Sequence, residues 1–302
     1  HSSHRRQRQM CIRDRDYWSA TQLNWLFFKV RQGDVQIEYA KSIIEGTCSL
    51  IKNDNKGWLG RPFTHSELFS NIVKISLFYG NSLILSKEVK RFLEESILFI
   101  LNNLEIYSES DKVSLNHTNN HLLANVRALF WATRVFDDIV LQESAEYVFK
   151  TNCMPLFDNG TLNEGSTIYH FIAAQCIFDI SFFLPTEELP RVDKLILKLE
   201  ENGFIEPIYF PIIGDVSPDP ILGTVIEDAL NISKKIYRKA HQENLNANDL
   251  EDISNFEFYK YKNWDWILHS RNTDDHIQHS HNDYGSPVLN YKNQNIIFDV
   301  GR

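Results

Sequence analysis

Apolar side chains recur at spacings of three and four residues from about residue 16 to residue 239. In 87–107, 120–140 and 166–184 they form one continuous stripe, which is the pattern of an amphipathic helix with a buried face. Weaker patterns of the same kind predict further helices over 22–29, 36–51, 65–78 and 225–240. Helices in succession, joined by short polar loops and without a fixed repeat length, predict a layer of paired helices.

Near Asn255 the pattern changes to a period of two. The segments 256–271 and 286–301 alternate aromatic or β-branched residues with polar ones, which is typical of strands. Pro287 is expected at an edge or a bulge, because proline cannot donate to a strand ladder. The predicted organisation is a non-native leader over 1–15, a helical domain over 16–240, a linker over 241–254, and the first strands of a β domain over 255–302.

Both ends of the chain are expected to be incomplete. Residues 1–15 hold five arginines against one aspartate, with no apolar periodicity and no hydrophobic core of a secretion signal. At the other end the chain stops inside or just after a predicted strand. We therefore expect a fragment truncated at both ends.

Composition narrows the class of protein. A hydrophobic content of 43% with 13% aromatic residues indicates a globular chain, and its longest apolar runs are interrupted by polar residues, which argues against a membrane span. The net charge of −9 disfavours nucleic acid and anionic membranes, so a polyanionic ligand needs a locally basic site. The four cysteines, Cys11, Cys48, Cys153 and Cys176, form no CxxC pair and lie in apolar surroundings, which indicates reduced core thiols.

Two helix starts carry polar residues of chemical interest. In "NNHLLAN", Asn120 and His121 fall in the first turn of a predicted helix, and in "NEGSTIYHF" Tyr169 and His170 do the same, behind Ser166 as a predicted N-cap. Each motif alone is more simply explained as a capped helix with packed polar side chains.

A third motif is a group of three histidines, His276, His279 and His281, within six residues. In "HSHND" the side chains of His279, His281 and Asp283 share one face of a strand, because strand side chains repeat every two residues. Histidine and carboxylate ligands grouped in this way suit a zinc-type ion, and Asp299 of the next segment is a further candidate ligand. The alternative is a solvated polar edge.

Taken together, these motifs resemble the heparinase II/III-like polysaccharide lyases in order and spacing. The likeness covers roughly 58–302 and includes "NNHLLANVRALFWA", "NEGSTIYHF", "IGDVSPDP" and "HSHNDYGSPVLNYKNQNIIFDVG". It implies an incomplete α/α toroid of paired helices followed by a truncated antiparallel β-sandwich domain. It also implies an acidic polysaccharide substrate and a periplasmic or secreted location.

The resemblance implies cleavage of a uronic-acid-containing glycan by β-elimination, in which the C5 proton is removed and the C4 oxygen is expelled. Asn120, assisted by His279, is then expected to neutralise the uronate carboxylate. Tyr169 is expected to act as the acid, and Tyr169 and His121 are the two candidates for the base. Both helix starts must then lie at one rim of the cleft. Arg127, Glu164 and His170 are the expected substrate-binding residues.

The resemblance also assigns His281 and Asp299 to a structural zinc site, whose third protein ligand is expected beyond the chain end. With two protein ligands, zinc would bind poorly. Arg61, Arg127 and Arg134 are candidates for a local basic patch, although each is equally explained as a surface or packing residue. The acidic net charge favours a uronate polymer less densely charged than heparin.

Two alternatives to the lyase stay open. One is a non-catalytic glycan-binding or assembly protein on the same fold. The other is a zinc-dependent hydrolase in which His279, His281 and Asp283 hold an ion that activates water.

Overall fold

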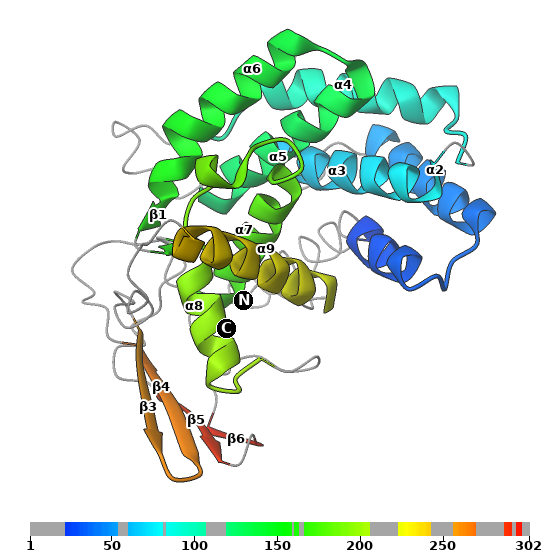
Figure 1. The fold of residues 1–302 in the computed structure, drawn as a ribbon. Helices are drawn as coiled ribbons and strands as arrows, with labels where there is room; N and C mark the ends of the chain where they lie inside the picture. Colours follow the sequence, from blue (N-terminus) through cyan, green and yellow to red (C-terminus); the bar gives the residue numbers. More distant parts are fainter. Residues whose placement is uncertain are drawn as a thin grey trace, which may run out of the picture. The chain divides into compact units, whose positions relative to one another are not determined.

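A computed structural model describes most of the helical region and four strands that follow it (Figure 1). The described residues are 22–53, 60–80, 83–106, 119–158, 160–162, 166–205, 223–242, 256–269, 287–291 and 294–297. Apart from one short hairpin, the helices come first along the chain and the strands last, which confirms the predicted order of helices followed by an antiparallel sheet.

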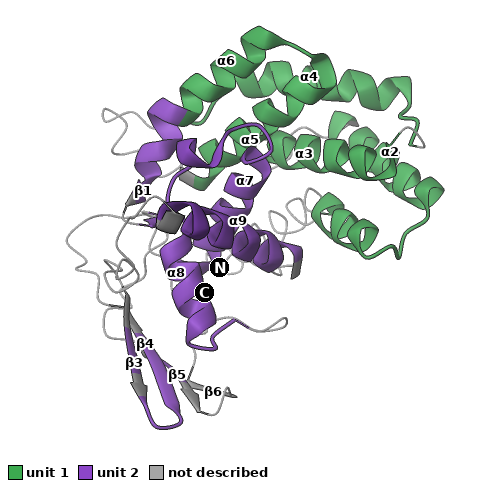
Figure 2. Cartoon of the chain, in the orientation of Figure 1, with its two compact units in different colours: residues 1–149 green, residues 150–302 purple. Residues whose placement is uncertain are grey.

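The chain divides into two compact units, His1–Phe149 and Lys150–Arg302, which Figure 2 shows in different colours. The division falls within the region expected to form one helical domain, so each unit is described by itself. The predicted domain boundaries themselves stay a prediction.

Unit 1 is helical in its described parts and is built around one buried helix. Its elements are a helix over 22–31, α2 (Ile37–Asn53), α3 (Pro62–Tyr79), α4 (Lys87–Asn102), α5 (Asn119–Phe136) and α6 (Ile139–Val148). Helix α3 packs against both α4 and α5, and nearly every residue from Phe63 to Ile75 is buried. Over this buried stretch α3 also buries polar side chains, and these need partners inside the protein.

The helix predicted over 120–140 is interrupted, because α5 ends at Phe136 and α6 begins at Ile139. Asp137 has a positive φ of 48°, and the carboxylate of Asp138 accepts hydrogen bonds from the backbone N–H groups of Val140 and Leu141 at 2.9 and 3.2 Å. The first aspartate thus ends α5, and the second caps α6. The prediction of one helix was wrong because both residues were read only as polar positions.

Unit 2 begins with short elements and continues with three longer helices. A π-helical turn, η4 (Phe149–Cys153), lies at the boundary. The elements that follow are η5 (Met154–Leu156), β1 (Phe157–Asp158), β2 (Thr161–Leu162), α7 (Thr167–Ile180), η6 (Thr186–Glu188), α8 (Asp193–Glu201) and α9 (Gly223–Gln242). Helix α9 packs against α7, α8 and η6. Helix α7 ends at Ile180, earlier than expected from Pro185, which instead precedes η6.

The last described elements form a four-stranded antiparallel sheet in the order β3-β4-β5-β6. Its strands are β3 (Phe256–Tyr261), β4 (Trp264–His269), β5 (Pro287–Tyr291) and β6 (Gln294–Ile297). Phe258, Ile267 and Val288 lie in register on one face, where Ile267 and Val288 are buried. Pro287 is the first residue of β5, and the ladder between β5 and β6 shifts register between Leu289 and Asn290, in agreement with the expected irregularity.

The other face of this sheet carries aromatic side chains. Tyr259 pairs with Trp266 and Tyr261 pairs with Trp264 across the β3–β4 hairpin. The rings of Tyr259 and Trp266 stack with their centroids 5.7 Å apart. Aromatic cross-strand pairs of this kind stabilise the hairpin register.

Three cysteines are buried thiols, as the sequence predicts. Cys48 lies in α2, Cys153 in η4 and Cys176 in α7, and none of them forms a disulfide bond. Burial raises the pKa of Cys48 to about 12, and burial also raises the pKa of Cys153. Both thiols are therefore protonated at neutral pH.

Among the helices described, none is both long and apolar enough to span a membrane.

Candidate functional site

The first turn of α5 holds two of the predicted catalytic residues. Asn120 and His121 lie there as expected and are 6% and 7% exposed. The Nδ1–H of His121 donates to Oε1 of Glu105 at 3.1 Å, and the imidazole stacks on Phe63 with a centroid distance of 4.4 Å. This pairing fixes the ring plane, and in the neutral tautomer that donates through Nδ1 the lone pair lies on Nε2.

One turn further along α5, Asn125 holds the segment that carries Glu105. Its side-chain carbonyl accepts a hydrogen bond from the backbone N–H of Glu105 at 3.2 Å, and its amide donates to the hydroxyl of Ser66 on α3 at 2.9 Å. Asn125 is fully buried. The position of the Glu105 carboxylate, and through it the orientation of His121, thus depends on a buried amide.

Arg127 lies among these helices and not on the surface. Its side chain is 2% exposed, and its guanidinium forms a short ion pair with Glu67 of α3, which is 7% exposed. This geometry favours a packing role for Arg127 over the predicted contact with substrate. Arg134 of the same helix is exposed, and Arg61 is half-buried just before α3, so the basic patch predicted from these three residues stays a prediction.

The start of α7 holds the other predicted pair. The hydroxyl of Ser166 accepts a hydrogen bond from the backbone N–H of Tyr169 at 3.5 Å, which confirms Ser166 as the N-cap. Tyr169 is half-buried, whereas both of its neighbours, Ile168 and His170, are buried. Within this turn, Tyr169 is the side chain that reaches solvent.

His170 joins three elements of unit 2. Its Nδ1 accepts a hydrogen bond from the backbone N–H of Leu162 at 3.0 Å, and its Nε2–H donates to the carbonyl of Val192 at 3.1 Å. Leu162 is presented by the β1–β2 hairpin, whose turn residue Gly160 has a φ of 88° and lies against the side chain of Lys194. With both ring nitrogens bonded and 1% exposure, the geometry favours a structural role for His170 over substrate binding.

The titration of His170 should make unit 2 sensitive to acid. Burial lowers its pKa from 6.5 to about 4, against the opposing effects of the Val192 carbonyl and Asp193. Below pH 6.5 the unfolded chain binds a proton that the folded chain rejects, so stability is full above pH 6.5 and falls as the pH drops toward 4. We expect a loss on the order of 3 kcal/mol across this window.

Urea unfolding followed between pH 7 and 4 measures this loss, with His170→Gln as the comparison because its amide offers a donor and an acceptor but does not titrate. The variant should show a shallower decline in this window. Equal declines in the two proteins would contradict the assignment.

Several predicted residues lie outside the described part of the chain. These are His276, His279, His281, Asp283 and Asp299 of the histidine segment, and Glu164 before α7. Their assigned roles, including the zinc site of His281 and Asp299, stay predictions. Among the described residues there is no group of three or more His, Cys, Asp or Glu that would hold a metal ion.

Sequence reasoning missed the partners of the predicted residues. Glu105 and Phe63 orient His121, and Glu67 pairs with Arg127. Glu105 stands alone in "NNLEIY" and carries no motif, so nothing marks it. Glu67 carried a usable signal, since it lies among apolar residues of α3 and a buried carboxylate needs a cation.

Comparison with known proteins identifies a shared fold. No protein-family model and no curated protein sequence matches this chain. Its structure resembles the crystal structure of heparinase III, with a TM-score of 0.60 and 15% sequence identity over 94% of this chain and 50% of that chain. The heparan sulfate lyase HepC from Pedobacter heparinus gives a TM-score of 0.44 and 15% identity over 91% and 47% of the two chains.

The chain thus spans about half the length of the heparinase III chain that it matches. At this level of identity the likeness shows the fold, namely paired helices followed by antiparallel strands. It agrees with the fold class predicted from the sequence.

Proposed function

We propose that this chain belongs to a polysaccharide lyase that cleaves a uronic-acid-containing glycan by β-elimination. The observation that carries the proposal is the fold shared with heparinase III over 94% of the chain. Because one fold hosts many functions, the residues of the site must supply the rest of the argument.

The residues at the start of α5 have suitable chemistry. Asn120 carries an amide that can donate to a uronate carboxylate, which makes the C5 proton more acidic by stabilising the charge that develops on its removal. His121, oriented by Glu105, carries the Nε2 lone pair that a general base requires. We propose Asn120 as the carboxylate-neutralising group, assisted by His279, and His121 as a candidate base.

Tyr169 is the proposed acid. It is the solvent-reaching side chain in the first turn of α7, and a phenol can give its proton to the departing C4 oxygen. In the reaction the base takes the C5 proton, the C4–O bond breaks with its electron pair leaving on oxygen, a C4–C5 double bond forms, and the oxygen is protonated. No water is consumed.

The structural support of each residue fits this division of roles. The helix cap at Tyr169 is formed by its backbone N–H and the hydroxyl of Ser166, so the phenol hydroxyl of Tyr169 takes no part in the cap. The Nδ1 of His121 contacts the Glu105 carboxylate, which leaves Nε2 as the nitrogen proposed to accept the proton. His170 is assigned to the framework because both of its ring nitrogens are bonded, and Arg127 because its buried guanidinium pairs with Glu67.

The direct test is an assay for the new double bond. The protein is incubated with heparan sulfate, alginate and unsulfated uronate polymers, and ultraviolet absorbance and reducing ends are followed together. We expect both to rise in parallel on at least one polymer. Reducing ends without absorbance would favour the zinc-dependent hydrolase, and silence in both assays with glycan binding intact would favour the binding protein.

A further inference from the structure

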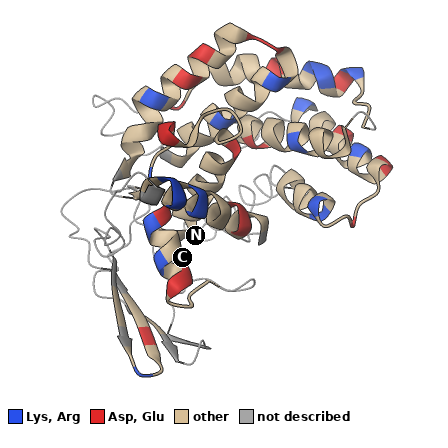
Figure 3. Ribbon diagram, viewed as in Figure 1, with Lys and Arg blue, Asp and Glu red and all other residues tan. Residues whose placement is uncertain are grey.

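The C-terminal half of α9 is strongly basic. Lys234, Lys235, Arg238 and Lys239 lie within six residues of an otherwise acidic chain whose net charge is −9. Figure 3 shows these positions gathered at one end of the helix, away from its acidic positions. The buried face of α9 includes Ile232 and Ile236, whereas Lys235 and Arg238 are exposed.

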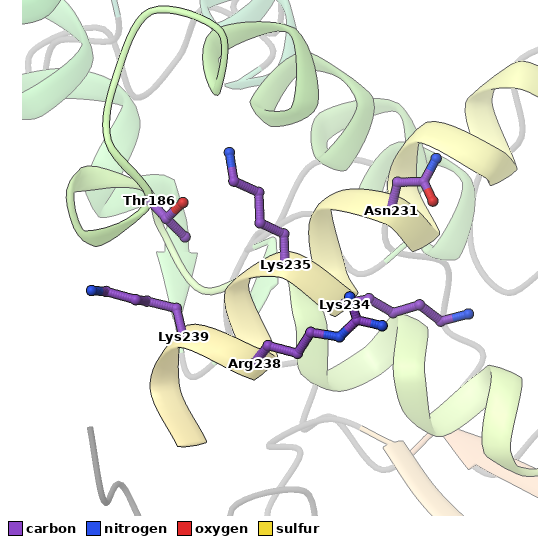
Figure 4. A pocket seen from close by; sticks show the side chains of 6 residues that line it. All are labelled: Thr186, Asn231, Lys234, Lys235, Arg238 and Lys239. Atoms are coloured by element: carbon purple, nitrogen blue, oxygen red, sulfur yellow. The ribbon is translucent and has the colours of Figure 1, made fainter. Parts of the chain in front are cut away.

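These cations line a pocket. With Thr186 of η6 and Asn231 they surround a volume of about 330 Å³. In Figure 4, Lys235 and Lys239 extend toward the side of Thr186, whereas Lys234 extends in the opposite direction. The pocket therefore has a floor on α9 and a wall at the short helix that packs against it.

The charge of this pocket is only partly balanced within the described residues. Lys234 pairs with Glu200 at 2.6 Å. Lys235 and Arg238 are exposed and form no hydrogen bond or ion pair with any residue that the structure describes. In η6, next to the lining residue Thr186, Glu188 pairs with Lys150 at 2.6 Å, and Glu187 is exposed.

The helix dipole explains part of this arrangement, because it favours cations at the C-terminal end. It does not explain their spacing. Lys234 with Arg238, and Lys235 with Lys239, are like charges four residues apart, and such pairs destabilise a helix. An anion bound between them would relieve this repulsion through charge-assisted hydrogen bonds.

We propose that this α9 pocket binds sulfate or carboxylate groups of an anionic polysaccharide. The choice of a glycan rests on the proposed function, and the choice of an anion rests on the pocket itself. The α9 pocket then supplies the local basic site that the acidic net charge demands and that the buried Arg127 does not supply. Its lining includes none of the residues proposed for the elimination step.

Binding measured without turnover tests this proposal. The full chain is titrated with size-defined heparan sulfate, dextran sulfate, alginate and neutral dextran at low ionic strength by calorimetry. Lys235→Gln/Arg238→Gln should bind the anionic polymers roughly tenfold more weakly and with a smaller dependence on salt. The matched control Lys87→Gln/Lys90→Gln removes the same charge from the exposed face of α4 and should bind as the wild type does.

The polymers separate the two anionic groups, since dextran sulfate offers only sulfate and alginate only carboxylate. Three results would overturn the proposal. They are equal affinity of the wild type and the α9 variant, an equal loss of affinity in the α4 control, and no binding by the wild type. In a further titration with single-stranded DNA, tighter binding to the DNA than to every polysaccharide would also overturn it. If binding of anionic polymers depends on Lys235 and Arg238 but no polymer yields a double-bond product, the α9 pocket is supported as an anion site. The proposed lyase activity is then contradicted.

Discussion

Replacing Tyr169 by phenylalanine is expected to lower kcat for β-elimination by about 10²–10⁴-fold, the usual contribution of a positioned acid or base. The substitution removes one hydroxyl and keeps the half-buried ring and the backbone hydrogen bond to Ser166. The expected loss is therefore in the chemical step, with KM little changed. The rate of double-bond formation at saturating polymer measures it.

Tyr237 provides a matched control for this result. It is a half-buried tyrosine on α9 of the same unit, outside the residues proposed for the reaction. Tyr237→Phe should retain most of the wild-type kcat, and both variants should unfold at similar urea concentrations. A Tyr169→Phe enzyme with wild-type kcat would remove Tyr169 from the mechanism.

Replacing Arg127 by methionine is expected to destabilise the protein by about 3–5 kcal/mol, because the Glu67 carboxylate is left buried without its cation. Neutralising that carboxylate as well should reverse most of the loss. In the double variant Glu67→Leu/Arg127→Met two apolar side chains replace the pair, and stability should return to within about 1–2 kcal/mol of the wild type. The free energy of unfolding in urea measures each step.

The same substitution at an exposed arginine of α5 shows whether burial is the cause. Arg134→Met should cost less than about 1 kcal/mol, since exposed charges contribute little. If Arg127 instead contacted substrate, Arg127→Met would raise KM and leave the unfolding midpoint near that of the wild type. That result would restore the role expected from the resemblance.

Periodicity located the long helices because their buried faces repeat along the chain, as the bounds of α4 and α9 show. Periodicity did not locate a helix end that depends on the conformation of single residues. The pair Asp137 and Asp138 separates α5 from α6 through a positive φ and a side-chain cap, and neither effect changes the apolar spacing. A search for consecutive aspartates within the stripe would have found the break.

The predicted site shows the same limit. Motifs placed Asn120, His121 and Tyr169 at helix starts correctly, because N-terminal turns follow local rules. They could not distinguish Tyr169, which reaches solvent, from His170, whose two partners come from β2 and from the residue before α8. Whether the side chain is buried or exposed depends on hydrogen-bond partners that are distant in sequence. The basic run of α9 was visible in the sequence, but its pocket depends on η6, which no pattern predicted.

The buried thiols make each unit accessible to a chemical measurement of its motions. Cys48 belongs to unit 1, and Cys153 and Cys176 belong to unit 2. Because a buried, protonated thiol reacts slowly, its alkylation must wait for a transient opening of the surrounding helices. In a protein that keeps only Cys48 or only Cys153, the alkylation rate therefore reports how often that unit opens, and a bound glycan that slows one rate but not the other identifies the unit it holds closed.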